Sequence, residues 1–384
     1  MEHLINKRVK QIEISGIRKF FNMVTGVEDM VSLSIGQPDF PTPGHVKEAA
    51  KKAIDDNFTT YTHNAGHIEL RRAAADFYRK KYSVDFSPEK EVIITVGASE
   101  AIDISLRTIL EDGCEVILPG PVYPGYEPII RLCGAVPVFA DIRLNQFRFT
   151  ADVIEQYITE KTRCIVLPYP SNPTGVSLTE EELEQIATLL KDKDIFILAD
   201  EIYSELVYGQ KHVSIAQFLK HKTIVINGLS KSHSMTGWRM GMVFAPEYVA
   251  SQMLKVHQYN VTCATSVSQM AAIEALTAGI DDAVPMKHEY ARRREYVYNR
   301  LQDMGLEVVM PDGAFYFFVK VPSDLPSFDF ALDLVNKEKV AVVPGSAFSE
   351  LGEGYFRLSY AYSMNTLEEG LNRLERYLTT HIKS

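Results

Sequence analysis

The chain has 384 residues, of which 46% are hydrophobic and 23% are charged, a composition typical of a globular protein with enough material for two domains. Its net charge of −10 argues against general nucleic-acid binding, and no apolar run is long enough to predict a transmembrane helix. The four cysteines are widely spaced and form no C-x-x-C pair, which disfavours a metal site and predicts free thiols in a reducing cytoplasm.

Residues 1–45 are expected to form an N-terminal arm with a short helix, followed by part of a small domain. The segment SLSIGQPDFPTP (Ser32–Pro43) contains three prolines and a glycine, so it predicts an ordered loop and not a long helix or a central strand. The pattern then turns helical, with one helix over about 46–54 and another from about Ile68. A turn around Asn64–Gly66 separates the two.

Seven short apolar runs then alternate with helical patterns. The runs are Val92–Val96, Glu115–Leu118, Val136–Phe139, Cys164–Leu167, Ile195–Ala199, Thr223–Ile226 and Met240–Ala245. Helical segments between them are Ser99–Leu110, Tyr126–Leu132, Thr150–Tyr157 and Thr179–Leu190, the last opened by a capping box of Thr179 and Glu182. This alternation predicts an α/β fold in which residues 46–284 form a large domain around a mostly parallel seven-stranded sheet flanked by helices.

A long helical region is expected from Pro246 to about Gly305, with its charged middle bridging the domains and its RRR run on a solvated face. After Gly305 the runs LEVVM, FYFFVK, VAVVPG and YFRLSYA predict strands, and Phe328–Asn336 and Thr366–Tyr377 predict helices. Residues 285–384 are therefore predicted to form a smaller α+β domain at the C-terminal end.

The stretch NGLSKSHSMTGWR, residues 227–239, carries the first candidate for chemistry. It follows the apolar run Thr223–Ile226, and a lysine just past a buried strand lies where α/β sheets bind ligands. A desolvated lysine loses its proton and can attack a carbonyl, and Ser230 and Arg239 would suit a phosphate. Lys231 is thus a candidate Schiff-base lysine for pyridoxal phosphate, the alternative being an ordinary solvated turn.

Two further strand ends carry residues that fit such a ligand. Gly97, Ala98 and Ser99 follow Val92–Val96 and begin a helix, where small residues let backbone N–H groups approach an anion. They also fit a plain tight turn. Tyr123 in GPVYPGY could stack on a planar ring, although simple packing would explain it equally.

The remaining candidates are polar residues at buried strand ends. Asn172, in the loop YPSNPTG, and Tyr203 could both hydrogen-bond a phenolate oxygen. Asp200 follows five apolar residues, where a carboxylate is costly unless paired, so it would suit a cationic ring nitrogen or else cap a helix. Arg357 could bind a substrate carboxylate with its planar fork, or lie on an edge strand at the surface.

With these motifs in place, the sequence resembles the class I and II aminotransferases of fold type I, over essentially its whole length. The matching segments are SLSIGQPDF, TTYTHNAG, TVGASEAI, GPVYPGY, YPSNPTG, ADEIYSEL, SKSHSMTGWRMG, GAFYFF, VPGSAF and FRLSYA. The resemblance implies a pyridoxal-phosphate-dependent enzyme that moves an amino group between an amino acid and a 2-oxo acid by a ping-pong mechanism. N-acetyl-diaminopimelate or another amino acid would be the donor.

The resemblance also implies roles for single residues and a homodimer with shared active sites. It implies that Lys231 is the cofactor lysine, that Asp200 contacts the ring nitrogen, that Asn172 and Tyr203 contact the ring oxygen, and that Tyr123 stacks on the ring. Arg239 would bind the phosphate, and Tyr61 would reach the phosphate of the neighbouring subunit. Arg357, beside Gly36, would bind the substrate carboxylate. The alternative for Tyr61 is packing beneath the Asn64–Gly66 turn. Some members have a serine three residues before the lysine where this chain has Gly228, which weakens the assignment of Ser230 to the phosphate.

Two rival functions remain at this stage. A carbon–sulfur β-lyase on the same fold would share every cofactor residue named above. A pyridoxal-sensing regulator would need an attached DNA-binding segment, and the residues before SLSIGQPDF are too few for one.

Overall fold

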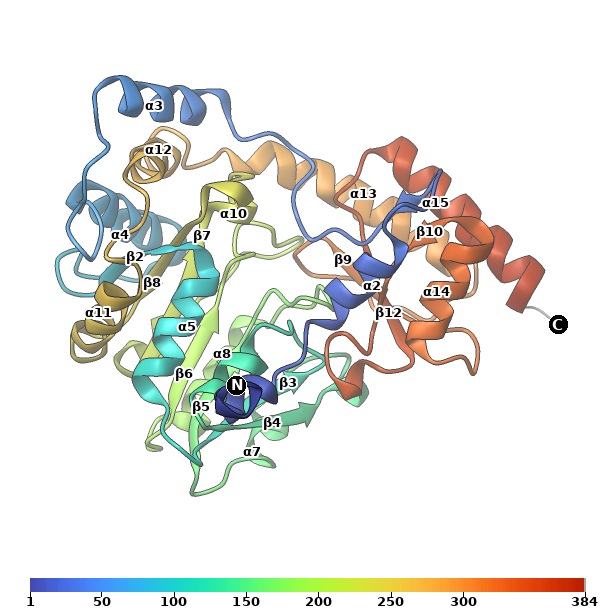
Figure 1. Ribbon diagram of the computed structural model, residues 1–384, viewed down its shortest axis with the longest axis horizontal. Coiled ribbons are helices and arrows are strands. Elements are labelled where there is room, and N and C mark those ends of the chain that lie inside the picture. The colour runs from blue at the N-terminus through green and yellow to red at the C-terminus, as the bar shows by residue number, and fades with distance from the viewer. Residues whose placement is uncertain (383–384) are drawn as a thin grey trace.

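The computed structural model describes residues 1–382, and its central feature is a seven-stranded sheet (Figure 1). In spatial order the strands are β2 (Val92–Val96), β8 (Met240–Phe244), β7 (Thr223–Gly228), β6 (Phe196–Asp200), β5 (Thr162–Leu167), β3 (Glu115–Gly120) and β4 (Val136–Asp141). All neighbours run parallel except β8, which is antiparallel to both β2 and β7. The predicted seven strands and the mostly parallel sheet are therefore confirmed.

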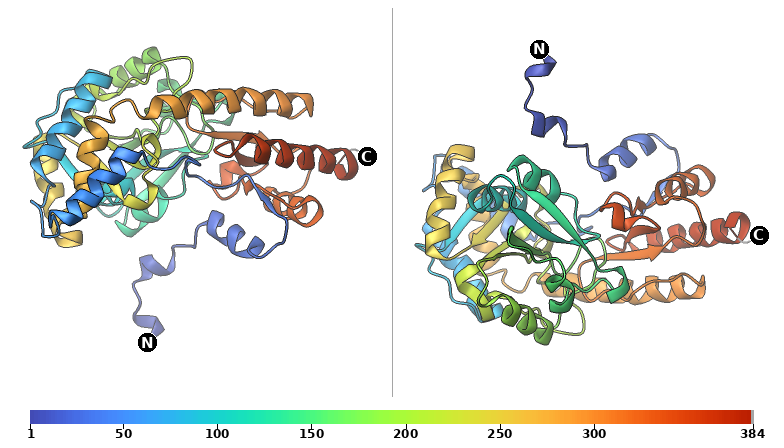
Figure 2. Two further views of the ribbon diagram at one scale, coloured as in Figure 1. Left: turned by 90° about the horizontal axis from the view of Figure 1, so that it is seen from above. Right: turned by 90° about the horizontal axis from the view of Figure 1, so that it is seen from below.

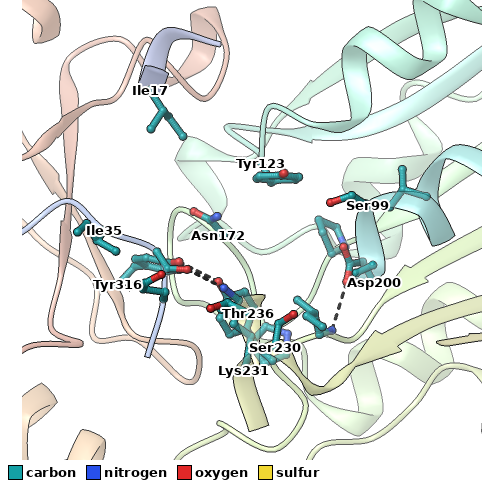
Figure 3. Close-up of a pocket in the computed structure, with 18 of the residues that line it drawn as sticks. Ile17, Ile35, Ser99, Tyr123, Asn172, Asp200, Ser230, Lys231, Thr236 and Tyr316 are labelled. Atoms are coloured by element: carbon teal, nitrogen blue, oxygen red, sulfur yellow. Dashed lines mark hydrogen bonds between the residues drawn. The ribbon is translucent and has the colours of Figure 1, made fainter. Parts of the chain in front are cut away.

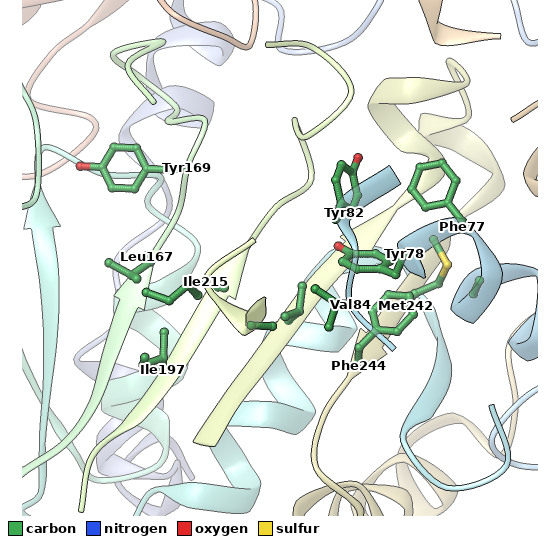
Figure 4. Packing of buried hydrophobic residues seen from close by; sticks show 14 of the residues in the cluster. Phe77, Tyr78, Tyr82, Val84, Leu167, Tyr169, Ile197, Ile215, Met242 and Phe244 are labelled. Atoms are coloured by element: carbon green, nitrogen blue, oxygen red, sulfur yellow. The ribbon is translucent and has the colours of Figure 1, made fainter. Parts of the chain in front are cut away.

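Alternate side chains of these strands enter two different cores, because successive residues of a strand point to opposite faces. Ile94 and Ile117 belong to one core, which packs against α4 (Ile68–Tyr82), α8 (Glu180–Leu190) and α12 (Ser266–Leu276). Figure 4 shows part of this core, where tyrosine and phenylalanine rings from α4 lie against β8. Ile93 and Val116 belong to the other core, beneath α5 (Gly97–Ile109), α6 (Tyr126–Leu132) and α11 (Glu247–Val261).

A local signal sets the start of α8. Thr179 and Glu182 form both hydrogen bonds of the predicted capping box at the start of α8. The remaining helices of this part of the chain are α3 (Gly44–Asp55), α7 (Ala151–Glu155), α9 (Ala216–Leu219) and α10 (Leu229–Ser232).

A second body combines the C-terminal third of the chain with an N-terminal segment. It contains a three-stranded sheet in the order β11 (Val343–Pro344), β12 (Tyr355–Ser359) and β9 (Tyr316–Lys320). It also contains a two-stranded sheet that pairs β1 (Val31–Ser32) with β10 (Val340–Ala341). Its helices are α2 (Gly16–Val24), α14 (Ser327–Glu338) and α15 (Met364–Tyr377). Phe20 and Leu33 are fully buried in the same core as Phe317 and Leu358, so residues far apart in sequence form one hydrophobic centre.

The first residues project from the sheet-containing body and contact it through Arg8. In both views of Figure 2 the dark blue N-terminal segment, which includes α1 (Lys7–Lys10), projects away from the sheet. Arg8 anchors it through an ion pair with Asp112 at 2.7 Å. No helix within residues 1–382 combines the length and the apolar character needed to cross a membrane.

The expected helical region Pro246–Gly305 consists of three helices, α11, α12 and α13 (Ala283–Asp303), and the first break falls at Thr262, whose φ is 67°.

Three sequence predictions need correction. LEVVM forms no strand and contributes a single bridge between Val308 and Val319. VAVVPG is divided between β10 and β11, which belong to different sheets. In the RRR run of α13, Arg293 is buried and not solvated. Helix α13 does run from one body to the other (Figure 1).

Candidate active site

A cavity of about 450 Å³ lies where the carboxyl ends of the parallel strands meet the second body. In parallel sheets these ends share one edge, which is where α/β folds bind ligands. The cavity brings together eleven of the predicted residues: Gly36, Ala98, Ser99, Tyr123, Asn172, Asp200, Tyr203, Ser230, Lys231, Arg239 and Arg357. Figure 3 shows Tyr123 across the space from Lys231, with Asp200 and Ser99 on one side and Tyr316 and Ile35 on the other.

Lys231 stands on α10, one turn after the buried strand β7. Its Nζ donates a hydrogen bond of 2.6 Å to the carbonyl of Gly36 and lies 5.5 Å from the centre of the Tyr203 ring. Burial of the ammonium, with the nearby positive charge of Arg357 as the next cause, lowers the pKa of Lys231 to about 8. Roughly a tenth of this amine is therefore uncharged at pH 7, far more than of an ordinary lysine with a pKa of about 10.4, and is available as a nucleophile or base.

Asp200 ends β6 and is 6% exposed. Its carboxylate accepts a hydrogen bond of 2.6 Å from the Tyr126 hydroxyl and one of 3.2 Å from the backbone N–H of Ile202. Burial raises the pKa of Asp200, and these hydrogen bonds oppose that effect. The segment after Asp200 forms turns and no helix, so its alternative role as a helix cap does not apply.

Arg357 lies on β12, the central strand of its sheet, and is 2% exposed, so it is not a surface arginine. Its guanidinium donates to Asn172 Oδ1 at 2.8 Å and to the carbonyl of Ser34 at 2.6 Å, and it stacks 4.3 Å from the centre of the Tyr316 ring. Its Nε is buried without a hydrogen-bond partner among residues 1–382. The Tyr316 hydroxyl also hydrogen-bonds that of Tyr203 at 2.8 Å.

A corner suited to an anion lies where the end of β2 meets the start of β8. Val96 pairs with Met240, which brings Gly97 and Arg239 together. Gly97 begins α5 with φ of 74°, and a Cβ there would collide with the Arg239 guanidinium. A helix N-terminus combined with an arginine is well suited to a phosphate group.

The loop of residues 34–40 closes the cavity from the second body. Gly36 has no room for a side chain, because a Cβ would lie 2.7 Å from the Tyr316 hydroxyl. Asp39 of the same loop forms an ion pair of 2.8 Å with Arg293, which is 6% exposed and lies over the Phe40 ring. Arg293 therefore anchors the loop that offers its carbonyls to Lys231 and Arg357.

Two predicted residues do not line the cavity. Gly97 lies immediately behind it, at the start of α5. Tyr61 is 84% exposed on a loop before α4, away from the other candidates of its own chain.

Sequence reasoning missed three residues that complete the site: Tyr126, Tyr316 and Arg293. Tyr126 lies three residues after Tyr123 and Tyr316 lies within FYFF, but neither position carries a local pattern that separates a hydroxyl in the site from ordinary packing. Arg293 stands in a charged run, and its partner Asp39 is 254 residues away, so no local pattern marks it either.

The residues present fit an anionic, planar ligand that carries a carbonyl group. The arginine and helix end hold the anion, Tyr123 offers a ring face, and the weakly basic Lys231 can attack a carbonyl. Fold and site together are those of an α/β protein in which a buried amine and a buried carboxylate line one ligand-sized cavity.

Comparisons with known proteins identify the family. The family model for aminotransferase class I and II matches residues 28–374, and the chain belongs to this family, so it is an enzyme of the transferase class. It is 60% identical to a Bacillus subtilis protein named "Probable N-acetyl-LL-diaminopimelate aminotransferase", over 98% of this chain and 96% of that protein. It is 42% identical to aromatic-amino-acid aminotransferase 2 of Thermococcus litoralis, over 97% and 98%.

Solved structures agree with this assignment. The structure of Thermus thermophilus aspartate aminotransferase with maleate superposes with a TM-score of 0.92 at 34% identity, covering 97% of this chain and 99% of that one. The aromatic aminotransferase of Pyrococcus horikoshii gives a TM-score of 0.89 at 40% identity, covering 94% and 98%. The fold is therefore that of the aminotransferases.

Proposed function

We propose that the protein is a pyridoxal-phosphate-dependent aminotransferase that moves an amino group between an amino acid and a 2-oxo acid by a ping-pong mechanism. The observation that carries the proposal is the presence, in one cavity, of the Lys231 amine with a pKa of about 8, the buried Asp200 carboxylate and the Arg357 guanidinium. Each group has one task in such a reaction. Asp200 faces the cationic ring nitrogen, Arg357 binds the negative α-carboxylate, and Lys231 exchanges the proton of Cα.

Each part of the cofactor has residues to hold it. When bound, pyridoxal phosphate supplies a ring that withdraws electrons from the Cα of the substrate. Asp200 holds a proton at the ring nitrogen, because its negative charge favours the cationic form. Asn172 and Tyr203 donate hydrogen bonds to the ring oxygen, and Tyr123 packs on the ring face. The phosphate residues are Gly97, Ala98, Ser99 and Arg239, with Ser230 beside them.

The substrate is bound and deprotonated by side chains on opposite walls. Arg357 receives the α-carboxylate with its two outer nitrogens, since a planar guanidinium matches two carboxylate oxygens. Gly36 leaves room for that carboxylate. As a free amine facing the same cavity, Lys231 would take the proton from the substrate Cα and carry it to the acceptor carbon of the bound ligand.

We further infer a homodimer with shared active sites, in which Tyr61 reaches the phosphate of the partner subunit. Its 84% exposure on this chain supports that role. One hydrophobic core takes most of its residues from 285–384 and from the N-terminal segment, which supports a large domain of residues 46–284 and a small domain of residues 285–384, with residues 1–45 as the arm and part of the small domain. The four free cysteines are consistent with a reducing cytoplasm.

The donor is the open part of the proposal. The name of the Bacillus subtilis relative makes N-acetyl-LL-diaminopimelate the first candidate, with other amino acids next. A screen of amino donors against 2-oxoglutarate and pyruvate tests this directly. Formation of a new amino acid supports transfer. Release of ammonia and pyruvate from a sulfur-containing amino acid, without transfer, would establish the β-lyase alternative, which the relatives do not support.

The role of Lys231 has a direct chemical test. Borohydride treatment of the holoenzyme should attach the cofactor to the peptide containing this lysine, as measured by mass spectrometry. Lys231→Ala should retain cofactor non-covalently and lose turnover. Normal turnover by that variant would show that Lys231 is not the lysine that binds the cofactor.

A further inference from the structure

Two buried titratable side chains, Glu100 and His257, have no part in the proposed reaction. They lie behind the corner formed by Gly97 and Arg239, where the phosphate is proposed to bind and which is called the phosphate corner below. Glu100 stands in the first turn of α5, directly after Ser99, and is 8% exposed. His257 comes from α11 and is completely buried. Its Nδ1 hydrogen-bonds Glu100 Oε1 at 2.8 Å.

The second carboxylate oxygen of Glu100 reaches the backbone. Oε2 accepts a hydrogen bond of 2.5 Å from the N–H of Val96, the last residue of β2 and the neighbour of Gly97. One carboxylate thus joins the end of the strand to the first turn of the helix. It does so at the point where the backbone N–H groups of residues 97–99 are presented to an anion.

Strand β8 also packs closely against the turn Gly97–Ser99. A Cβ on Gly241 would lie 2.6 Å from the backbone nitrogen of Ala98, so there is no room between strand and turn for a side chain. Glu100 is therefore a buried support of a turn whose backbone β8 also confines.

His257 depends on Glu100 for its polar contact. Within the described part of the chain its Nε2 is buried and has no hydrogen-bond partner. A buried carboxylate is costly unless its oxygens are satisfied, and the histidine supplies one of the two hydrogen bonds that Glu100 receives. Loss of the imidazole would leave that oxygen unpaired and the Val96–Glu100 contact free to shift.

We propose that Glu100 and His257 form a positioning pair that sets the geometry of the turn Gly97–Ser99, and thereby the affinity of the protein for the phosphate group of its cofactor. Both residues act through the backbone of the turn, and neither lines the cavity. The inference rests on the proposed function, because it takes pyridoxal phosphate as the ligand of this corner.

The test compares pyridoxal phosphate with pyridoxal, which lacks the phosphate, in titrations of the cofactor-free protein followed by absorbance. His257→Leu should weaken binding of pyridoxal phosphate roughly tenfold, the effect expected for an unpaired buried polar group, and leave pyridoxal nearly unchanged. His257→Asn, which returns an amide N–H close to the position of Nδ1, should recover most of the difference. Glu100→Ala, which removes both acceptor oxygens, should resemble His257→Leu.

The matched control is Asp103→Asn on the same helix. Asp103 also pairs with a basic side chain, Arg107 at 2.9 Å, but lies a turn further from the phosphate corner. This variant should bind both ligands as the wild type does. If His257→Leu does not fold, the comparison of Glu100→Ala with His257→Asn tests the same point, because only the first removes the hydrogen bonds of the pair.

The outcomes separate this inference from the proposed function. If the wild type binds pyridoxal phosphate and the variants keep its preference over pyridoxal, the positioning role is wrong and the aminotransferase proposal stands. Equal weakening of both ligands would also overturn it, since a general loss of structure predicts that result. If the wild type binds neither ligand, the proposed function itself fails.

Discussion

Replacing Tyr126 by phenylalanine would test whether the hydrogen bond to Asp200 serves the reaction. The hydroxyl donates to the carboxylate at 2.6 Å, and Tyr126 is 1% exposed, so water cannot take its place without rearrangement. A hydrogen bond to a charged group contributes about 1.5–3 kcal/mol, which corresponds to roughly a 10- to 150-fold loss if the charge of Asp200 is needed in the transition state. The rate of the first half-reaction, measured by rapid mixing with an amino acid, gives this factor.

The pH dependence should change in a defined direction. Burial raises the pKa of Asp200 and the Tyr126 hydrogen bond lowers it, so removing the hydroxyl raises that pKa further. The carboxylate then loses its charge at a higher pH as the solution is acidified, and the acid side of the pH–rate profile should move to higher pH. Tyr208→Phe is the control, because Tyr208 also donates a buried 2.6 Å hydrogen bond, to the Ala314 carbonyl, and does not line the cavity. Equal rates and equal profiles for both variants would refute the reasoning.

Three further predictions follow from the same site. Arg357→Lys keeps the charge but loses the planar fork, so KM should rise for all amino and oxo acids alike, and an effect confined to one substrate would mean that Arg357 contacts a side chain. In the cofactor-free protein, acylation of Lys231, followed by peptide mass spectrometry, should level off above its pKa of about 8, whereas a continued rise towards about 10.4 would show an ordinary lysine. Mixing Lys231→Ala chains with chains in which a Tyr61 substitution cripples cofactor binding should restore activity, because a mixed dimer would hold one intact site. No recovery on mixing would place Tyr61 in its own chain's site.

The strands of the large sheet could be predicted because buried parallel strands have nearly continuous apolar sequences, and each run ended at a recognisable turn. LEVVM has the same composition, yet it forms only the Val308–Val319 bridge. A run of apolar β-branched residues shows only that the side chains favour a packed, pleated surface. A strand also needs a partner along its whole length, and that depends on the tertiary fold.

The site could be predicted wherever its residues followed strand ends, as Asp200 and Lys231 do. Tyr126 and Arg293 were missed because their partners are distant in sequence. Asp39 lies 254 residues before Arg293, and Asp200 lies 74 residues after Tyr126. A charged run such as RRR is usually exposed to solvent, and the ion pair with Asp39 that buries one arginine exists only once the loop of residues 34–40 has packed against α13.

The antiparallel pairing of β2 with β8 has a consequence for biosynthesis. β8 is the last strand of the sheet in the sequence, and it separates β2, the first, from β7. A growing chain that has emerged only as far as β7 has all the other strands, yet it lacks the strand that brings Gly97 to Arg239. Forming this pair closes a loop of well over a hundred residues, a slow step for non-local contacts. Stable retention of the cofactor should therefore be a late event, reached only after the whole large sheet is assembled.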